Sequence, residues 1–111
     1  MLRGLFFSRI PSRNTTFEEK VRSGIYDQYV GEYVYDERPD LTVQIRREGN
    51  RLVGRANGQR NELIGIGDSI HELATKEFDG RGRFVCNEAG RVTHFIYYEF
   101  GKAMGIARKV A

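Results

Sequence analysis

The amino-acid sequence predicts an all-β protein, a small eight-stranded antiparallel up-and-down barrel that follows a short N-terminal helix. From residue 29 onward, apolar residues recur at every second position, which is the period of strands with one buried face. Pairs such as Gly49-Asn50 and Asn57-Gly58 separate these runs and are typical of tight hairpin turns. No intervening segment is long enough for a crossover, so sequence neighbours should pair and close into a barrel. A helix on a curved, open antiparallel sheet, of the α+β class, is the alternative.

Length and composition limit the chain to one soluble domain. Its 111 residues suffice for a single domain, and 40% apolar with 30% charged residues is ordinary for a soluble globular protein. No apolar stretch approaches the ~20 residues of a membrane span, so no membrane interaction is expected. Cys86 is the single cysteine, which excludes an internal disulfide and favours a reducing, cytoplasmic location.

The formal charge of +3 resides in an N-terminal arm, residues 1–13, which holds three arginines and no acid. Residues 14–111 form the predicted folded domain and carry as many acidic as basic side chains. Because a nucleic-acid-binding domain is normally basic as a whole, no nucleic-acid partner is expected. Five arginines between Gln44 and Arg60 are a local exception. No aromatic stacking residue accompanies them on their face, so we interpret this hairpin as solvated surface.

A short helix is predicted over residues 16–28. The Thr15-Thr16 pair has a glutamate three residues after each member, which is a capping box in either register. Phe17, Val21 and Ile25 then recur at every fourth position and form one apolar stripe. The pattern therefore predicts an amphipathic helix.

The barrel should occupy residues 29–110. A two-residue type II′ turn at Gly49-Asn50 sets Ile45 opposite Gly54. This register pairs large with small residues on one face, as a tightly curved sheet interior requires, and leaves the other face wet. The predicted inward residues are Tyr33, Leu41, Val43, Ile45 and Leu52. The later strands are expected at about 60–66, 69–75, 84–86, 91–99 and 102–109.

Three stretches of the chain resemble a known bacterial domain. They are "YVGEYVY", "LTVQIRREGNRLVGRANGQ" and "FVCNEAGRVTHFIYYEFGKAMGIARKV", and together they span Tyr29 to Val110. The domain they resemble has no assigned function. It is often appended to the C-terminal end of beta-lactamase-like and penicillin-binding-protein-like serine hydrolases. The resemblance implies a small lipocalin-like barrel without catalytic residues of its own, although no hydrolase is present in this chain.

The residues themselves also argue against catalysis and against a bound cofactor. No serine stands in S-x-x-K or G-x-S-x-G, and no phosphate-binding glycine loop is present. His71, Cys86 and His94 have spacings that match no zinc finger. His71 and Glu72 are adjacent on a strand and point to opposite faces, so they cannot form a local acid–base pair. We therefore expect no enzyme activity, no metal and no cofactor.

A ligand site is expected at the barrel mouth. A barrel of eight strands is just wide enough to be filled by side chains or to hold one small ligand. The sequence places Tyr33, His71 and Tyr98 near strand ends, where they could bind a small apolar or amphipathic ligand. The alternative is a filled barrel that serves as a structural or protein-interaction module through its outer surface.

The last hairpin predicts a homodimer. A tight turn near Phe100-Gly101 sets Phe95 opposite Ile106 and Tyr97 opposite Met104, and makes both faces of the hairpin largely apolar. Only one face can point inward, so the other should be covered by a second subunit or by the arm in cis. The predicted interface residues are Leu5, Phe6, Phe7, Phe95 and Tyr97. The arm is interpreted as a packed segment, although its composition also fits a mitochondrial presequence.

Overall fold

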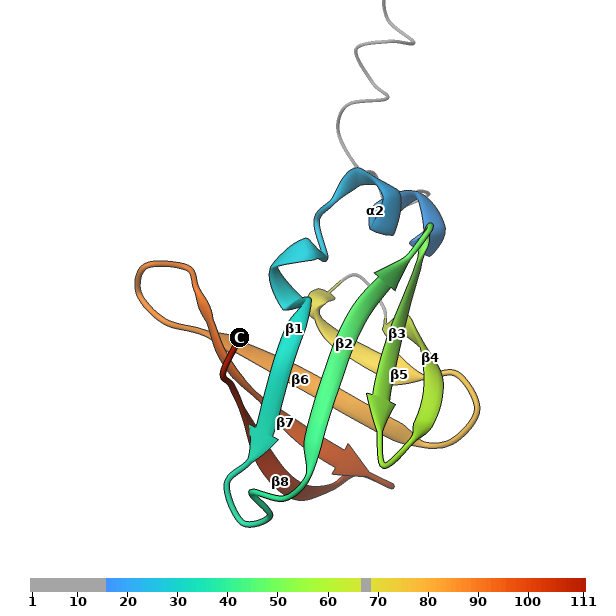
Figure 1. Ribbon diagram of the computed structural model, residues 1–111. Helices are drawn as coiled ribbons and strands as arrows, with labels where there is room; N and C mark the ends of the chain where they lie inside the picture. The colour runs from blue at the N-terminus through green and yellow to red at the C-terminus, as the bar shows by residue number, and fades with distance from the viewer. Residues whose placement is uncertain (1–15, 67–68) are drawn as a thin grey trace, which may run out of the picture.

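The structure, a computed structural model, describes residues 16–66 and 69–111. Its strands form a closed antiparallel barrel in which each strand pairs with its neighbours in sequence and β8 pairs back onto β1 (Figure 1). The predicted eight-stranded up-and-down barrel with a short N-terminal helix is therefore confirmed, and the closed ring rules out the open sheet. The strands are β1 (Gly31–Tyr35), β2 (Thr42–Glu48), β3 (Arg51–Ala56), β4 (Gln59–Ile66), β5 (Ser69–Thr75), β6 (Gly80–Cys86), β7 (Val92–Glu99) and β8 (Lys102–Lys109).

Two short helices of the described chain cover one end of the barrel, the α-helix α2 (Phe17–Ser23) and the 3-10 helix η1 (Asp27–Tyr29) (Figure 1). Thr16 caps α2, because its hydroxyl accepts a hydrogen bond from the Glu19 N–H at 3.2 Å. This cap satisfies one of the backbone donors that a helix leaves unpaired at its start. Of the two predicted capping registers, the structure therefore uses the one from Thr16 to Glu19.

The helix is shorter than the predicted range of 16–28. Gly24 adopts a left-handed conformation, with φ of 92°, and its N–H donates to the Val21 carbonyl. Glycine takes this conformation without steric cost, so the chain leaves the helix at this point. The reversal turns Tyr26 and Tyr29 into the end of the barrel, where both side chains are buried.

The first hairpins have the predicted register. Gly49 has φ of 65° at the β2–β3 turn, and Ile45 lies opposite Gly54. Asn57 and Gly58 have φ of 53° and 74°, as a type I′ turn between β3 and β4 requires. The turn residues that are visible in the sequence thus determine which face of β2 and β3 points inward.

The inward face contains the predicted core residues. Tyr33, Ile45 and Leu52 are buried, with 0%, 3% and 0% of their surface exposed. Leu41 and Val43 are half-buried and line a cavity. The core therefore has the predicted phase, but it is not filled to the same degree at both ends of the barrel.

The predicted register of the last hairpin is confirmed next to the turn, where Glu99 lies opposite Lys102, and is wrong by one residue beyond Tyr98. A β-bulge beside Tyr97 leaves Met104 unpaired, so that Tyr97 lies opposite Gly105 and Phe95 lies opposite Ala107. Phe95 is 5% exposed, and Tyr97 packs against the buried cluster. These two residues, which the sequence assigned to an intersubunit interface, therefore lie inside the barrel.

Replacing Leu52 with Ala should lower the free energy of unfolding by about 2–5 kcal/mol, because a fully buried side chain is lost and a cavity remains. Urea denaturation followed by circular dichroism measures this loss. Ile64→Ala is the matched control, since Ile64 is 36% exposed on the adjacent strand β4 and should cost clearly less. Equal losses for the two variants would contradict the inward phase of β3.

Candidate functional site

An aromatic plug fills the half of the barrel lumen that lies nearest the helices. It consists of Tyr26, Tyr29, Tyr33, Phe84 and Phe95, and none of them is more than 5% exposed. The ring centroids of Tyr29 and Phe84 are 4.4 Å apart, and those of Phe84 and Phe95 are 5.2 Å apart, with tilted planes. Tilted rings at this spacing attract one another through their quadrupoles. Together with α2 and η1, the plug closes this end.

The hydroxyls of the plug are held by hydrogen bonds. The Tyr33 hydroxyl donates to the Tyr29 carbonyl at 2.8 Å, and the Tyr29 hydroxyl lies 2.8 Å from Nδ1 of His71. Burial raises the pKa of Tyr29 to about 12 and raises the pKa of Tyr33 as well. Because a buried hydroxyl without a partner would be costly, these bonds determine where the rings can sit.

The other half of the lumen contains a cavity of about 320 Å³. Its deep walls are apolar, and they include Val43, Ile45, Leu63, Leu73, Phe84 and Phe95. The space exists because the facing positions on β3 and β6 are small: Gly54, Ala56, Gly80 and Gly82 line the same cavity. Its mouth lies at the end of the barrel opposite α2, where the β3–β4 turn and the β5–β6 loop meet (Figure 1).

Strand β6 begins at Gly80, four residues before the start at Phe84 that the sequence predicts. The glycines at 80 and 82 resemble a loop, but both lie in the strand. A Cβ atom at Gly80 would lie 2.8 Å from the Tyr97 hydroxyl, so only glycine leaves room for this tyrosine at the cavity rim. The glycines of β6 therefore serve the lumen and do not break the strand.

Polar side chains form the rim of the cavity. The rim residues are Asn57, Gln59, Asn61, Thr75, Tyr97 and Glu99. The Tyr97 hydroxyl donates to Oε2 of Glu99 at 2.8 Å. Burial is the main cause that raises the pKa of Tyr35 to about 12, and the nearby Glu99 carboxylate adds to it. Burial and the Glu99 carboxylate raise the pKa of Tyr97 as well. The carboxylate thus acts on two phenols at the mouth.

The structure brings none of the three ligand residues predicted from the sequence to this cavity. Tyr33 lies in the aromatic plug, and His71 contacts Tyr29 near the helices. Tyr98 is half-buried beside Arg81, whose guanidinium carbon lies 5.7 Å from the centre of its ring. The cavity is at the opposite end of the lumen from Tyr33 and His71.

Sequence reasoning missed the rim residues of β4, although a signal for them exists. Gln59 and Asn61 have the same phase as Leu63 and lie opposite Ala56 and Gly54, so they are polar residues at inward positions. No hydrogen bond within the described part of the chain uses their side-chain amides. Polar residues facing small ones across an inward face are the pattern of a polar-rimmed cavity.

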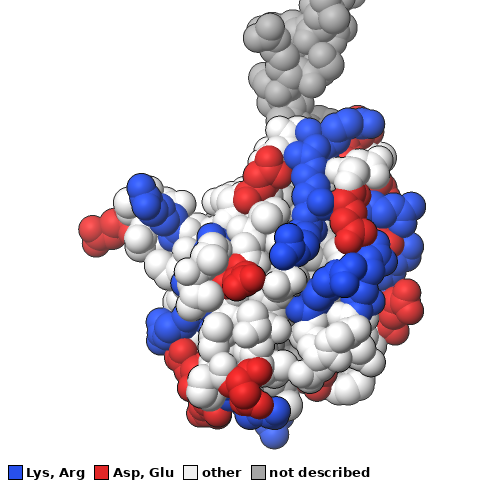
Figure 2. Space-filling model, viewed as in Figure 1, with Lys and Arg blue, Asp and Glu red and all other residues white. Residues whose placement is uncertain are grey.

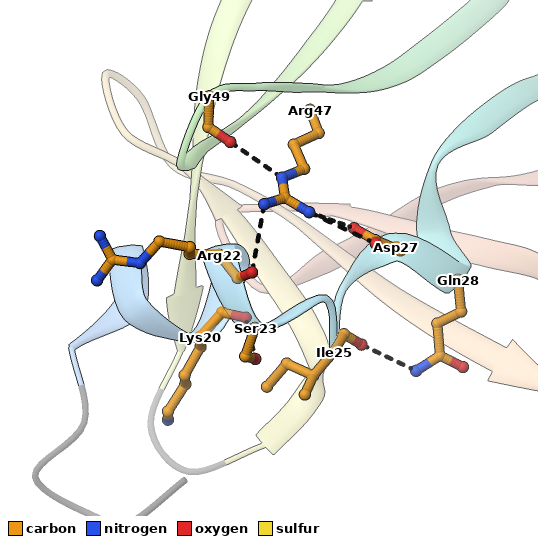
Figure 3. A network of polar contacts seen from close by, with 8 residues as sticks. All are labelled: Lys20, Arg22, Ser23, Ile25, Asp27, Gln28, Arg47 and Gly49. Carbon is orange, nitrogen blue, oxygen red and sulfur yellow. Dashed lines mark hydrogen bonds and ion pairs between the residues drawn. The ribbon is translucent and has the colours of Figure 1, made fainter. Parts of the chain in front are cut away.

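The arginine-rich β2–β3 hairpin is largely paired with acids. Arg47 donates to Asp27, at 3.3 Å, and to the carbonyls of Arg22 and Gly49, which ties the helical cap to the hairpin (Figure 3). Arg51 forms an ion pair with Glu62. Figure 2 shows basic and acidic side chains interspersed over β2, β3 and β4. This agrees with the interpretation of the hairpin as solvated surface.

Leu5, Phe6 and Phe7, the other predicted interface residues, lie outside the described residues, as does the arm at 1–13. Within 16–66 and 69–111, no three His, Cys, Asp or Glu side chains lie together in a way that could hold a metal ion. No helix in these ranges is long and apolar enough to cross a membrane.

Comparisons with known proteins give no match for this chain. No family model, no curated protein and no solved structure matches it. The resemblance to the domain appended to serine hydrolases therefore stays a prediction.

The protein should lose stability as the pH rises from about 10 toward 12. Five tyrosines at the plug and the mouth have pKa values above their ordinary 10.0 when folded. The unfolded chain therefore releases these protons first and becomes more stable relative to the folded protein. As the pH rises, the tyrosinate absorbance of the native protein should lag behind that of urea-unfolded protein. A native titration curve that coincides with the curve of the urea-unfolded protein would contradict this packing.

Proposed function

We propose that the protein is a non-catalytic binding module that holds a small apolar or amphipathic ligand in the open half of its barrel. The observation that carries this proposal is the cavity of about 320 Å³, with apolar walls and a polar rim. Pockets for small molecules usually measure about 300–1,000 Å³ and combine an apolar lining with a few polar groups. A volume at the lower end of this range fits one ring or a short chain.

The chemistry of the lining supports binding without catalysis. The described residues that line the cavity include no Ser, Cys, His or Lys. A nucleophile paired with a base is the usual arrangement for covalent catalysis, and the lining lacks the residue types that most often provide it. The proposal includes a cytoplasmic location, which rests on the single, free thiol of Cys86.

Ala56→Trp should abolish ligand binding, because Ala56 lines the cavity and an indole would fill much of it. Ala89→Trp is the matched control, since Ala89 is exposed between β6 and β7 and is not part of the lining. A thermal-shift screen with single-ring and short-chain amphiphiles measures binding, where stabilisation of about 2.7 kcal/mol corresponds to ligand at 100 times its dissociation constant.

Hits in this screen should stabilise the native protein and Ala89→Trp equally and leave Ala56→Trp unchanged. A ligand that stabilises all three proteins to the same extent binds elsewhere, and the cavity would not be its site. A flat response of the native protein across the screen would count against the proposed function.

We also propose that a second copy of the chain covers the outer face of the β7–β8 hairpin. This face carries exposed apolar side chains: Phe100 is 84%, Met104 is 52% and Ile106 is 36% exposed. Phe100 has φ of 51°, a conformation that is costly for a bulky residue and that holds its ring outward at the turn. An apolar face of this kind on each subunit is self-complementary under a two-fold axis.

Sedimentation equilibrium of the full chain at tens of micromolar should show a dimer, and Ile106→Glu should convert it to a monomer. Ile64→Glu is the control, because Ile64 has the same exposed fraction of 36% but lies on β4, across the barrel from β8. A monomeric native chain, or dissociation by both variants alike, would contradict the dimer through β7–β8.

A further inference from the structure

The barrel mouth has a charge opposite to that of the whole chain. The chain carries a formal +3, yet the segments that surround the mouth, 36–41, 76–79 and 99–102, hold six acidic and three basic side chains. Figure 1 places these connections at the end of the barrel away from α2. The acidic residues are Asp36, Glu37, Asp40, Glu77, Asp79 and Glu99.

Ion pairs leave this excess of negative charge in place and show which groups carry it. The basic groups Arg38 and Lys76 pair with Asp40 and Glu62, and Asp36 pairs with Arg108. Of the remaining mouth residues, four carboxylates and one ammonium have no ion pair within the described chain. The carboxylates are those of Glu37, Glu77, Asp79 and Glu99, and the ammonium is that of Lys102.

Glu99 is the carboxylate that reaches the cavity itself. It lines the space together with Tyr35 and Tyr97, and it accepts the Tyr97 hydroxyl at Oε2, which leaves Oε1 without a hydrogen bond among the described residues. Arg81 also borders the cavity, but its guanidinium lies near the Tyr98 ring and 3.8 Å from Glu72. An acceptor of full negative charge is thus available to a ligand inside the mouth.

The aromatic residues of the mouth favour the same kind of ligand group. Tyr35, Tyr97 and Phe78 line the cavity, and Phe78 is 45% exposed. Aromatic rings attract cations through their negative faces, most strongly where water is partly excluded. Carboxylate and rings together suit an ammonium or guanidinium group and disfavour a second carboxylate, which Glu99 would repel.

We propose that the ligand of this cavity is a small organic cation, an amine or guanidinium on an apolar body of about one ring, whose charged group is bound by Glu99. The apolar body lies against Val43, Ile45, Leu63 and Leu73. The amides of Gln59 and Asn61, on the other side of the rim, accept its remaining N–H groups. This inference rests on the proposed function of the cavity and adds the charge of its ligand.

Three probes of equal shape test the inference by calorimetry at neutral pH and low salt: 4-phenylbutylamine, 4-phenylbutan-1-ol and 4-phenylbutanoate. The amine should bind at least about tenfold more tightly than the carboxylate, with the alcohol between them, since a charge-assisted hydrogen bond is about twice as strong as a neutral one. Glu99→Gln should weaken amine binding by about tenfold and leave alcohol binding unchanged. Glu88→Gln, in the β6–β7 loop at the other end of the barrel, should change neither.

Lys102 provides an independent arm of the test. It is the cross-strand neighbour of Glu99, so its ammonium opposes a cationic ligand, and Lys102→Gln should strengthen amine binding. Equal affinity for amine and carboxylate, or an unchanged amine affinity in Glu99→Gln, would overturn the inference while alcohol binding upholds the cavity as a ligand site. Failure of all three probes to bind at millimolar concentration would count against the proposed function itself.

Discussion

The hydrogen-bonded pairing of β8 with β1 is the constraint on which the rest of the structure depends. It sets Tyr33 opposite Lys109 and Tyr35 opposite Ala107, and it turns a meander of hairpins into a ring without open edges. Once eight strands close, the width of the lumen is nearly fixed. What remains for the sequence to decide is how the side chains that point inward share that volume.

The side chains that point inward fill the lumen unevenly along the barrel axis. The half beneath α2 and η1 is occupied by Tyr29, Tyr33, Phe84 and Phe95. The hydroxyls of the two tyrosines form hydrogen bonds within the fold. In the other half, glycine and alanine on β3 and β6 leave a cavity with a polar rim. The aromatic plug and the two helices stabilise the fold from one end, and the opposite end is open to a ligand.

The sequence predicted the barrel well because turn residues and alternation are local signals. Gly49-Asn50 and Asn57-Gly58 determine the register of three strands, and the inward phase of Ile45 follows from them. The bulge at Met104 has no such signal, so the pairs beyond it were predicted wrongly. Both faces of this hairpin are apolar in the sequence, so alternation did not show that Phe95 and Tyr97 point inward. The predicted ligand residues Tyr33, His71 and Tyr98 do not line the cavity, because alternation gives the face of a residue and not which end of the lumen is filled.

The central claim is that side chains fill the lumen beneath the helices and leave a cavity with apolar walls in its open half. A crystal structure under xenon pressure tests it most directly, since xenon binds apolar cavities that hold no side chain. Xenon should lie among Ile45, Leu63 and Leu73, and none should lie between Tyr29 and Tyr33. A lumen that is collapsed around Ile45, Leu63 and Leu73 and binds no xenon would contradict the account.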